Sequence, residues 1–180
     1  MINLIFGWSL ADRETEALVK MDVEVKVGAL IMDPQSGTPI VVLRGIEEEV
    51  VLPIWVGTFE AHAIALEIEK SVPQRPLTHD LLRNVVSELG AVVERVIITN
   101  LRDNTFFAVI ELTHETLGAV TIDSRPSDAI ALALRFSCSI WVRREVLETA
   151  GANAAASNSA VEEFEIDETE TTEDWPELIG

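Results

Sequence analysis

The helix start at Arg125-Pro126 constrains the fold of this chain more than any other feature of the sequence. Apolar residues 118–122 (GAVTI) predict a strand that ends at Asp123, and a strongly apolar helix is predicted over residues 126–136. Proline suits the first helical position because its φ is already helical and its missing N–H would have no partner there. Since the residue before a proline is kept out of the helical region, we expect Arg125 to lie in the turn, with its side chain free to cross it.

The spacing of apolar residues along the whole chain predicts the element order βββ-αα-βββ-α-β-α. Hairpins and helices come in blocks, which favours an α+β domain with an antiparallel-rich mixed sheet and three main helices over a doubly wound parallel sheet. Because proline cannot donate to a sheet ladder, Pro53 predicts that the third strand lies at an edge or contains a bulge. Predicted strands cover residues 22–33, 38–44, 50–56, 91–99, 105–112, 118–122 and 139–142, and predicted helices cover 58–70, a segment from Arg75-Pro76 to about Leu89, 126–136 and a final turn near 143–149.

Charge divides the 180-residue chain into regions: 31 acidic residues face 13 basic ones, for a net charge of −18. Residues 152–180 hold nine of the acidic residues, no Lys or Arg and few apolar residues, so we predict a disordered acidic tail. Residues 21–151 form the predicted single compact domain, and residues 1–20 are a predicted N-terminal extension, with Met21 as a candidate internal start. The acidity counts against a simple high-affinity DNA-binding protein, because no basic field steers nucleic acid to the chain.

The sequence also predicts a reducing, cytoplasmic location. Cys138 is the single cysteine, so no intramolecular disulfide can form, and no Cys/His spacing suggests a zinc site. The apolar stretch at residues 2–11 is short and lacks the preceding positive charge of a secretory signal. No stretch approaches the roughly 20 apolar residues needed to cross a bilayer, so we expect no association with a membrane.

Polar side chains surround the start of the predicted 126–136 helix. Asp123 ends the preceding strand, while Ser127 and Asp128 lie in the first helical turn near the positive end of the helix dipole. The two carboxylates are candidate ligands for Mg²⁺ or Mn²⁺, and Arg125 and Ser127 are candidates for binding the substrate's phosphate oxygens. The alternative is structural: an aspartate in a first turn is ordinary capping chemistry, and Arg125 between two carboxylates would form an ion pair.

A second Arg-Pro pair, Arg75-Pro76, precedes another predicted helix. Thr78 is a candidate cap for that helix, and Asp80 would favour its dipole. His79 is one of three histidines and lies beside a carboxylate, so it is a candidate general base or metal ligand, with Asp80 as a further catalytic candidate. The alternative is a histidine that points to solvent next to an ordinary cap.

Together these motifs resemble the bifunctional nuclease domain family. The resemblance covers about residues 22–149 and implies an α+β fold, frequent dimers and, for some members, degradation of both DNA and RNA. One departure is Phe107, where the family often has tyrosine. The resemblance is carried by LPIWVG at 52–57, Glu60-Ala61, RPLTHDL at 75–81 and DSRPSDAIALA at 123–133, and the matched polar candidates are Arg75, His79, Asp80, Asp123, Arg125 and Asp128.

Two functions remain open from the sequence. One is a metal-assisted nuclease in which Asp123 and Asp128 hold the ion, Arg75 and Arg125 neutralise transition-state charge, and His79 moves a proton. The other is a non-catalytic oligomeric scaffold or regulatory binding module in which the same turns are structural locks. A mean hydropathy of +0.24 despite the polar tail predicts a homodimer under either function. No phosphate-binding or dinucleotide glycine motif occurs, so no organic cofactor is expected.

Overall fold

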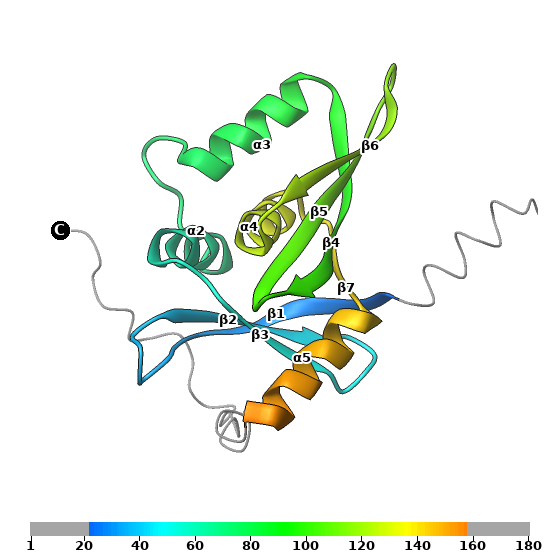
Figure 1. The fold of residues 1–180 in the computed structure, drawn as a ribbon. Coiled ribbons are helices and arrows are strands. Elements are labelled where there is room, and N and C mark those ends of the chain that lie inside the picture. The colour runs from blue at the N-terminus through cyan, green and yellow to red at the C-terminus, as the bar shows by residue number, and fades with distance from the viewer. Residues whose placement is uncertain (1–21, 158–180) are drawn as a thin grey trace, which may run out of the picture.

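The computed structural model describes residues 22–157, in which seven strands form one mixed sheet with four helices packed on it (Figure 1). The expectations for residues 1–20 and for the chain beyond Ser157 lie outside the described residues. The element order within them is the predicted one. The strands are β1 (Asp22–Met32), β2 (Pro39–Gly45), β3 (Val51–Trp55), β4 (Ala91–Arg102), β5 (Thr105–His114), β6 (Gly118–Ser124) and β7 (Ser139–Arg143), and the helices are α2 (Thr58–Ile68), α3 (Thr78–Glu88), α4 (Pro126–Phe136) and α5 (Arg144–Ser157).

The strand order is β3-β2-β1-β7-β4-β5-β6. Only β7 and β4 are parallel, and the other five neighbouring pairs are antiparallel, which confirms the predicted antiparallel-rich mixed sheet. Strand β3 is an edge strand, as Pro53 predicted, because the missing N–H of a proline costs no ladder hydrogen bond at an edge. Asp103 and Asn104 both have positive φ, and β4 and β5 are joined there by a tight hairpin turn.

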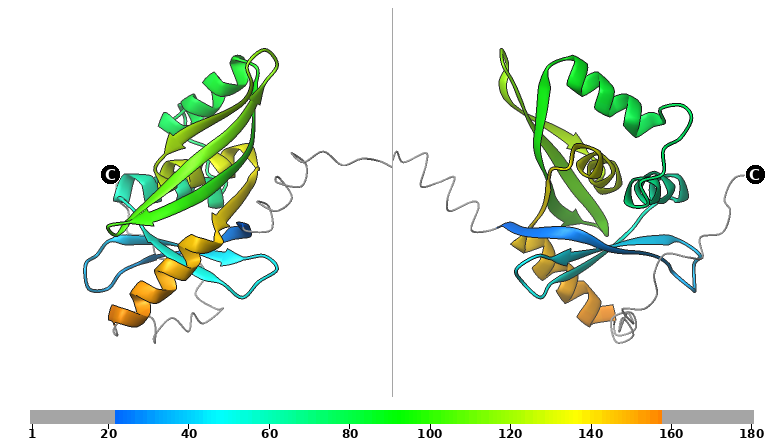
Figure 2. Two further views of the ribbon diagram at one scale, coloured as in Figure 1. Left: turned by 45° about the vertical axis from the view of Figure 1, so that its right-hand side comes forward. Right: turned by 180° about the vertical axis from the view of Figure 1, so that it is seen from behind.

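The two halves of the sheet are steeply inclined to each other, and three helices fill the angle between them (Figures 1 and 2). One half consists of β1, β2 and β3, and the other of β4, β5 and β6, with β7 between them. Helices α2 and α4 pack against each other in this angle, and α3 packs across the outer side of α4. Helix α5 packs against β4 and β7 on the other side of the sheet.

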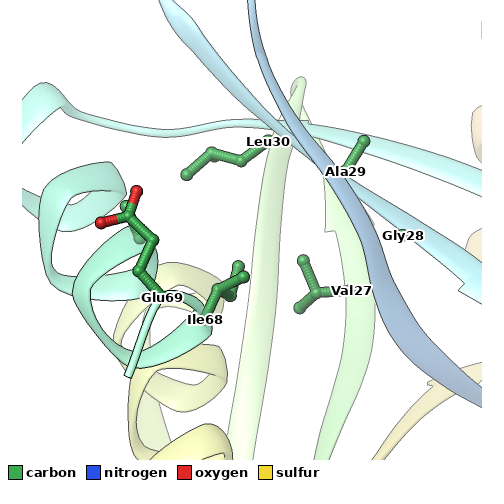
Figure 3. Close-up of a pocket in the computed structure, with 7 residues that line it drawn as sticks. Val27, Gly28, Ala29, Leu30, Ile68 and Glu69 are labelled. Carbon is green, nitrogen blue, oxygen red and sulfur yellow. The ribbon is translucent and has the colours of Figure 1, made fainter. Parts of the chain in front are cut away.

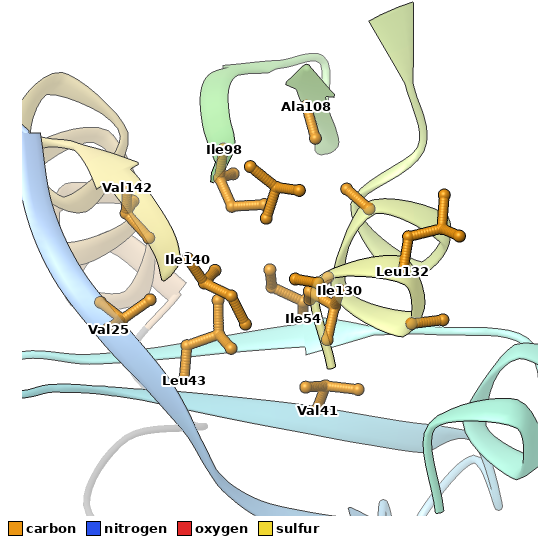
Figure 4. Packing of buried hydrophobic residues seen from close by; sticks show 14 of the residues in the cluster. Val25, Val41, Leu43, Ile54, Ile98, Ala108, Ile130, Leu132, Ile140 and Val142 are labelled. Atoms are coloured by element: carbon orange, nitrogen blue, oxygen red, sulfur yellow. The ribbon is translucent and has the colours of Figure 1, made fainter. Parts of the chain in front are cut away.

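Helix α4 is the centre of the hydrophobic core (Figure 4). Ile130 is fully buried and faces Leu43, Ile54 and Ile140 from the sheet. Each such side chain contributes about 1.5–3 kcal/mol through removal of apolar surface from water. Small residues dominate the rest of the helix and the facing side of α2, which lets the two helices lie close together. The buried alanines are Ala129, Ala131 and Ala133 on α4 and Ala61, Ala63 and Ala65 on α2.

Of the two helix starts at Arg-Pro pairs, one is as predicted and the other differs. Helix α4 begins as predicted, with Arg125 as its N-cap and Pro126 at the first helical position. Helix α3, however, begins at Thr78 with Leu77 as its N-cap, so Pro76 precedes the helix and Thr78 is not the cap. The Asp80 carboxylate accepts the Leu77 N–H at 2.9 Å, and this bond sets the start of α3 in place of the proline.

The last helix is longer than predicted. Helix α5 has 14 residues and ends at Ser157, six residues inside the segment assigned to the tail. Residues 152–157 are rich in alanine, the strongest helix former, which explains why the helix continues past the expected end of the domain. No helix in the described part of the chain is long and apolar enough to cross a membrane.

Helix α3 turns its apolar side away from the domain. None of its residues is buried, yet its polar side chains at positions 79 and 80 bond to the domain body. The apolar residues Leu81, Leu82 and Val85, together with Leu89 at the C-cap, are 42–68% exposed. We call these four residues the α3 stripe. Val86 packs partly buried against the core, but no residue of α3 is fully buried, so the polar contacts contribute much of what holds this helix in place.

Candidate functional site

The two Arg-Pro turns meet in space. His79 in the first turn of α3 lies beside Asp128 in the first turn of α4, with 3.1 Å between His79 Nε2 and Asp128 Oδ1. The two residues are 49 positions apart in the chain, so their contact depends on how α3 and α4 pack. The structure thus brings together two of the four predicted catalytic residues, both half-buried.

Arg125 clamps the same carboxylate from the other side. Its Nε and Nη2 donate to Asp128 Oδ2 and Oδ1 at 2.7 and 3.1 Å, and its Nη1 lies 2.9 Å from Glu60 Oε1. Burial by itself would raise the pKa of Asp128, but the hydrogen bonds from Arg125 and His79 outweigh it and hold that pKa below its usual range. The bonds from Asp128, followed by those from Glu60, raise the pKa of Arg125 above its usual range.

Glu60 is a member of this cluster that the sequence analysis did not select. It lies in the first turn of α2, and its carboxylate folds back over the helix start at Gly57. A Cβ at position 57 would lie 2.2 Å from Glu60 Oε2, so the glycine makes room for the carboxylate. The local sequence marks Glu60 only as an acidic residue three positions after a glycine at a helix start. That pattern does not identify Arg125 as the ion-pair partner of Glu60.

Asp80 has a different partner from its neighbour His79. Its Oδ1 accepts from Nε of Arg135 at 2.6 Å, and the Arg135 side chain is only 2% exposed. Burial works to raise the pKa of Asp80, yet the bonds from Arg135 and from the Leu77 N–H together lower it. The sequence analysis also missed Arg135, although it is the one basic residue of α4 and lies seven residues after Asp128, on the same helical face.

The remaining predicted site residues do not join the His79–Asp128 contact. Asp123 lies exposed near the end of β6, opposite Val109, and forms no ion pair with Arg125 in the described part of the chain. Ser127 is 7% exposed in the first turn of α4. Arg75 lies exposed in the loop before α3, and within residues 22–157 it has no carboxylate partner.

The side chains as arranged do not fit a divalent ion. Mg²⁺ requires a near-octahedral set of oxygen ligands, and Mn²⁺ also prefers oxygen. Both oxygens of Asp128 already accept from Arg125 and His79, and Asp123 is not part of the cluster. Across residues 22–157, no group of three His, Cys, Asp or Glu side chains is close enough to hold a metal ion.

A small hollow lies elsewhere, between β1 and the end of α2 (Figure 3). Its lining is apolar apart from Glu69, and none of the predicted site residues contributes to it. The cluster of His79, Asp128 and Arg125 is therefore separate from this hollow. The lining residues are Val27, Gly28, Ala29, Leu30, Ala65, Ile68 and Glu69.

Comparison with known proteins confirms the family resemblance that the sequence motifs indicated. Residues 41–155 match the bifunctional nuclease domain. Two proteins of Mycobacterium tuberculosis, the uncharacterized protein Rv1829 of strain H37Rv and the uncharacterized protein MT1877 of strain CDC 1551, are each 38% identical over 128 residues, which cover 71% of this chain and 76% of theirs. The match includes both Arg-Pro turns and Glu60, and it supports a nuclease-like kind of function. The chain belongs to the bifunctional nuclease domain family.

Proposed function

We propose that this protein is a nuclease that hydrolyses phosphodiester bonds in DNA, RNA or both at the cluster of His79, Asp128 and Arg125. The contact between His79 Nε2 and Asp128 Oδ1 carries this proposal, together with membership of the family. A carboxylate that accepts one ring N–H of a histidine fixes the orientation of the ring and leaves the other nitrogen for proton transfer.

In the proposed reaction, His79 acts as general base through Nδ1. Its Nε2–H donates to Asp128, so Nδ1 is the acceptor of the neutral ring and takes a proton from the attacking water. Water oxygen then bonds to phosphorus, and the bond from phosphorus to the leaving oxygen breaks. The resulting imidazolium, stabilised by the Asp128 carboxylate, returns its proton to the leaving oxygen or to solvent.

Phosphate would be held by Arg125, which shares the Asp128 carboxylate with this histidine, and by Arg75, which precedes it by four residues in the chain. Arg125 uses three of its five N–H groups on Asp128 and Glu60, which leaves two for phosphate oxygens. The Arg125 side chain is 65% exposed, and Arg75 is exposed in the loop before α3. The N-terminus of α4, whose backbone N–H groups favour an anion, lies at the same place.

The charges of the cluster predict weak binding of nucleic acid. Glu60 and Asp128 outnumber Arg125, and the whole chain carries −18. Few phosphate contacts give a shallow dependence of affinity on salt, with log Kd changing by about one unit per tenfold change in salt for each phosphate neutralised. We expect a slope of about two, from Arg75 and Arg125.

The test uses the purified full chain with single- and double-stranded DNA and RNA, in Mg²⁺, Mn²⁺ or a chelator. We expect cleavage by the parent, strong loss in His79→Gln and Asp128→Asn, and retention in His114→Gln, a histidine at the end of β5 with bonds of its own to Leu89 and Thr116. Because the cluster as arranged does not fit a divalent ion, we expect cleavage to persist in the chelator and in Asp123→Asn, whereas loss of cleavage in both would support the metal-assisted reaction predicted from the sequence. No cleavage under any condition, or cleavage that persists in both site variants, would rule out the nuclease.

The alternative, a non-catalytic oligomeric scaffold or regulatory module, is favoured by one observation. Arg125 forms ion pairs with both Asp128 and Glu60, as expected if the role of these charges is to hold α2 against α4. If the protein is such a module, the parent chain would cleave no nucleic acid. His79→Gln and Asp128→Asn would then change only its stability or its assembly.

We also propose a homodimer in which the α3 stripes of two copies pack against each other. The stripe is centred on Val85, with Leu81 four residues before it and Leu89 four residues after it. An antiparallel pairing of two such helices about a two-fold axis sets Leu81 of each copy against Leu89 of the other, which is the self-complementary arrangement that a two-fold dimer requires. Residues 72–90 carry two basic and two acidic residues, so this surface adds no net charge to the repulsion between two acidic copies.

Light scattering after gel filtration tests the dimer. We expect two chains per particle for the full-length protein and one for Leu81→Glu/Leu89→Glu. The matched control is Leu117→Glu, because Leu117 is 72% exposed at the turn between β5 and β6 and lies outside the stripe. A monomeric parent, or a double variant that stays dimeric, would contradict this interface.

A further inference from the structure

We propose that Arg135 is a positioning residue that holds His79 against Asp128 by anchoring Asp80, the next residue in the chain. The consequence for cleavage rests on the proposed nuclease function, but the positioning of His79 does not. Arg135 lies in the last turn of α4 and is the most deeply buried of the charged side chains that form ion pairs in the described residues, with a 2% exposed side chain.

The guanidinium of Arg135 contacts all three helices that carry the cluster. Nε donates to Asp80 Oδ1 on α3 at 2.6 Å. Nη1 donates to the carbonyl oxygens of Ala63 on α2 at 3.1 Å and of Ala131 on α4 at 2.9 Å. Each of these helices contributes one member of the cluster: Glu60 on α2, His79 on α3 and Asp128 on α4. One side chain therefore fixes the relative placement of the three.

Helix α3 depends on this anchor because, within one chain, its hydrophobic packing against the core comes from a single partly buried residue, Val86. None of its residues is buried, and the α3 stripe faces away from the domain. Asp80 connects the helix to the body through Arg135, and its second oxygen holds the N-cap through the Leu77 N–H. Because His79 and Asp80 are consecutive, a shift of α3 that releases Asp80 also moves His79 Nε2 away from Asp128.

Arginine suits this position better than lysine. A guanidinium is planar and donates in several fixed directions at once, here to one carboxylate and two carbonyl oxygens. An ammonium on a flexible stem can replace the charge but not the three-way geometry. We therefore expect Arg135→Lys to keep the domain folded and loosen the attachment of α3.

The first readout is the histidine side-chain ¹H–¹⁵N spectrum of the full-length chain, which has only three histidines. In the parent we expect a hydrogen-bonded Nε2–H signal from His79, assigned by its loss in His79→Gln. Arg135→Lys and Asp80→Asn should both lose that signal. The control is Arg95→Lys, which alters the partly buried 2.7 Å pair between Arg95 and Glu111 on β4 and β5 and should keep it.

The second readout is steady-state cleavage. A misplacement of about 1 Å costs on the order of 100-fold in rate, so kcat should fall by that amount in Arg135→Lys while KM changes little. Retention of the His79 signal in folded Arg135→Lys and Asp80→Asn would overturn the proposal. Global unfolding of both variants, seen by circular dichroism, would also overturn it, because Arg135 would then be a core residue and not a positioning one. If the parent does not cleave nucleic acid, the spectra alone still decide whether Arg135 places His79.

Discussion

Removal of the Asp80 carboxylate should destabilise the protein far more than removal of an exposed carboxylate. Asp80→Ala leaves the guanidinium of Arg135 buried without its counter-charge, although the carbonyl oxygens of Ala63 and Ala131 remain as acceptors. Breaking a buried ion pair from one side costs about 3–5 kcal/mol. Since the Asp80 side chain is 18% exposed and the two carbonyls stay, we expect the lower end, about 3 kcal/mol.

The assay is unfolding of the full-length chain at neutral pH, by urea for the free energy and by heat for Tm. Circular dichroism monitors both transitions. For a chain of this size, about 3 kcal/mol corresponds to a decrease in Tm of roughly 6–12 °C. The control is Glu111→Ala, whose ion pair with Arg95 is more exposed and contributes about 1 kcal/mol or less. Equal losses in the two variants would refute the assignment of Asp80 and Arg135 as a buried pair.

A double variant and a pH series test the same reasoning. Asp80→Ala/Arg135→Met should be more stable than Asp80→Ala, because the uncompensated charge is gone. Folding lowers the pKa of Asp80, so its contribution to stability is present above the ordinary carboxyl value of about 4 and is lost as the pH falls through the lower folded-state value. The difference between parent and Asp80→Ala should therefore narrow below about pH 4.

Three further predictions concern the core and the cluster. Ile130→Ala removes a fully buried side chain and should cost about 2–5 kcal/mol in urea unfolding, whereas a loss below 1 kcal/mol would place Ile130 outside the core. Gly57→Ala should displace Glu60 from Arg125, with a loss of stability of about 1 kcal/mol or less. Because this frees an N–H of Arg125, oligonucleotides should bind more tightly at low salt. Unchanged affinity would contradict this prediction. Asp128→Asn should lower Tm at pH 7 and have little effect below about pH 4, since folding lowers the pKa of Asp128; a constant difference across pH would contradict that sign.

Local chemistry determined what could be predicted from the sequence. Pro126 sets the start of α4 through its own φ, and Gly90 ends the α3 segment in the positive-φ conformation that suits glycine. Both effects act over a few residues, so the element order, the start of α4 and the end of α3 followed from the sequence. The edge position of β3 followed from Pro53 in the same way.

The partners of the charged residues could not be predicted because they depend on packing between distant segments. Arg135 reaches Asp80 across 55 positions and Ala63 across 72. Helical periodicity identifies the apolar side of α3 but does not say whether it faces the core, and here it faces outward because His79 and Asp80 bind the body. The sequence therefore located the chemistry of the site without Glu60 and Arg135, the two residues that hold it together.

The central place of β7 in the sheet has a consequence for how the protein is made. Strand β7 is the last strand in the chain, yet it joins β1 to β4 and so connects the two halves of the sheet. During synthesis, β1–β3 and β4–β6 can each form hairpins, but they cannot join into one sheet until residues 139–143 leave the ribosome. Contacts of such long sequence separation slow folding, so we expect the domain to complete its fold only after almost all of it has been synthesised.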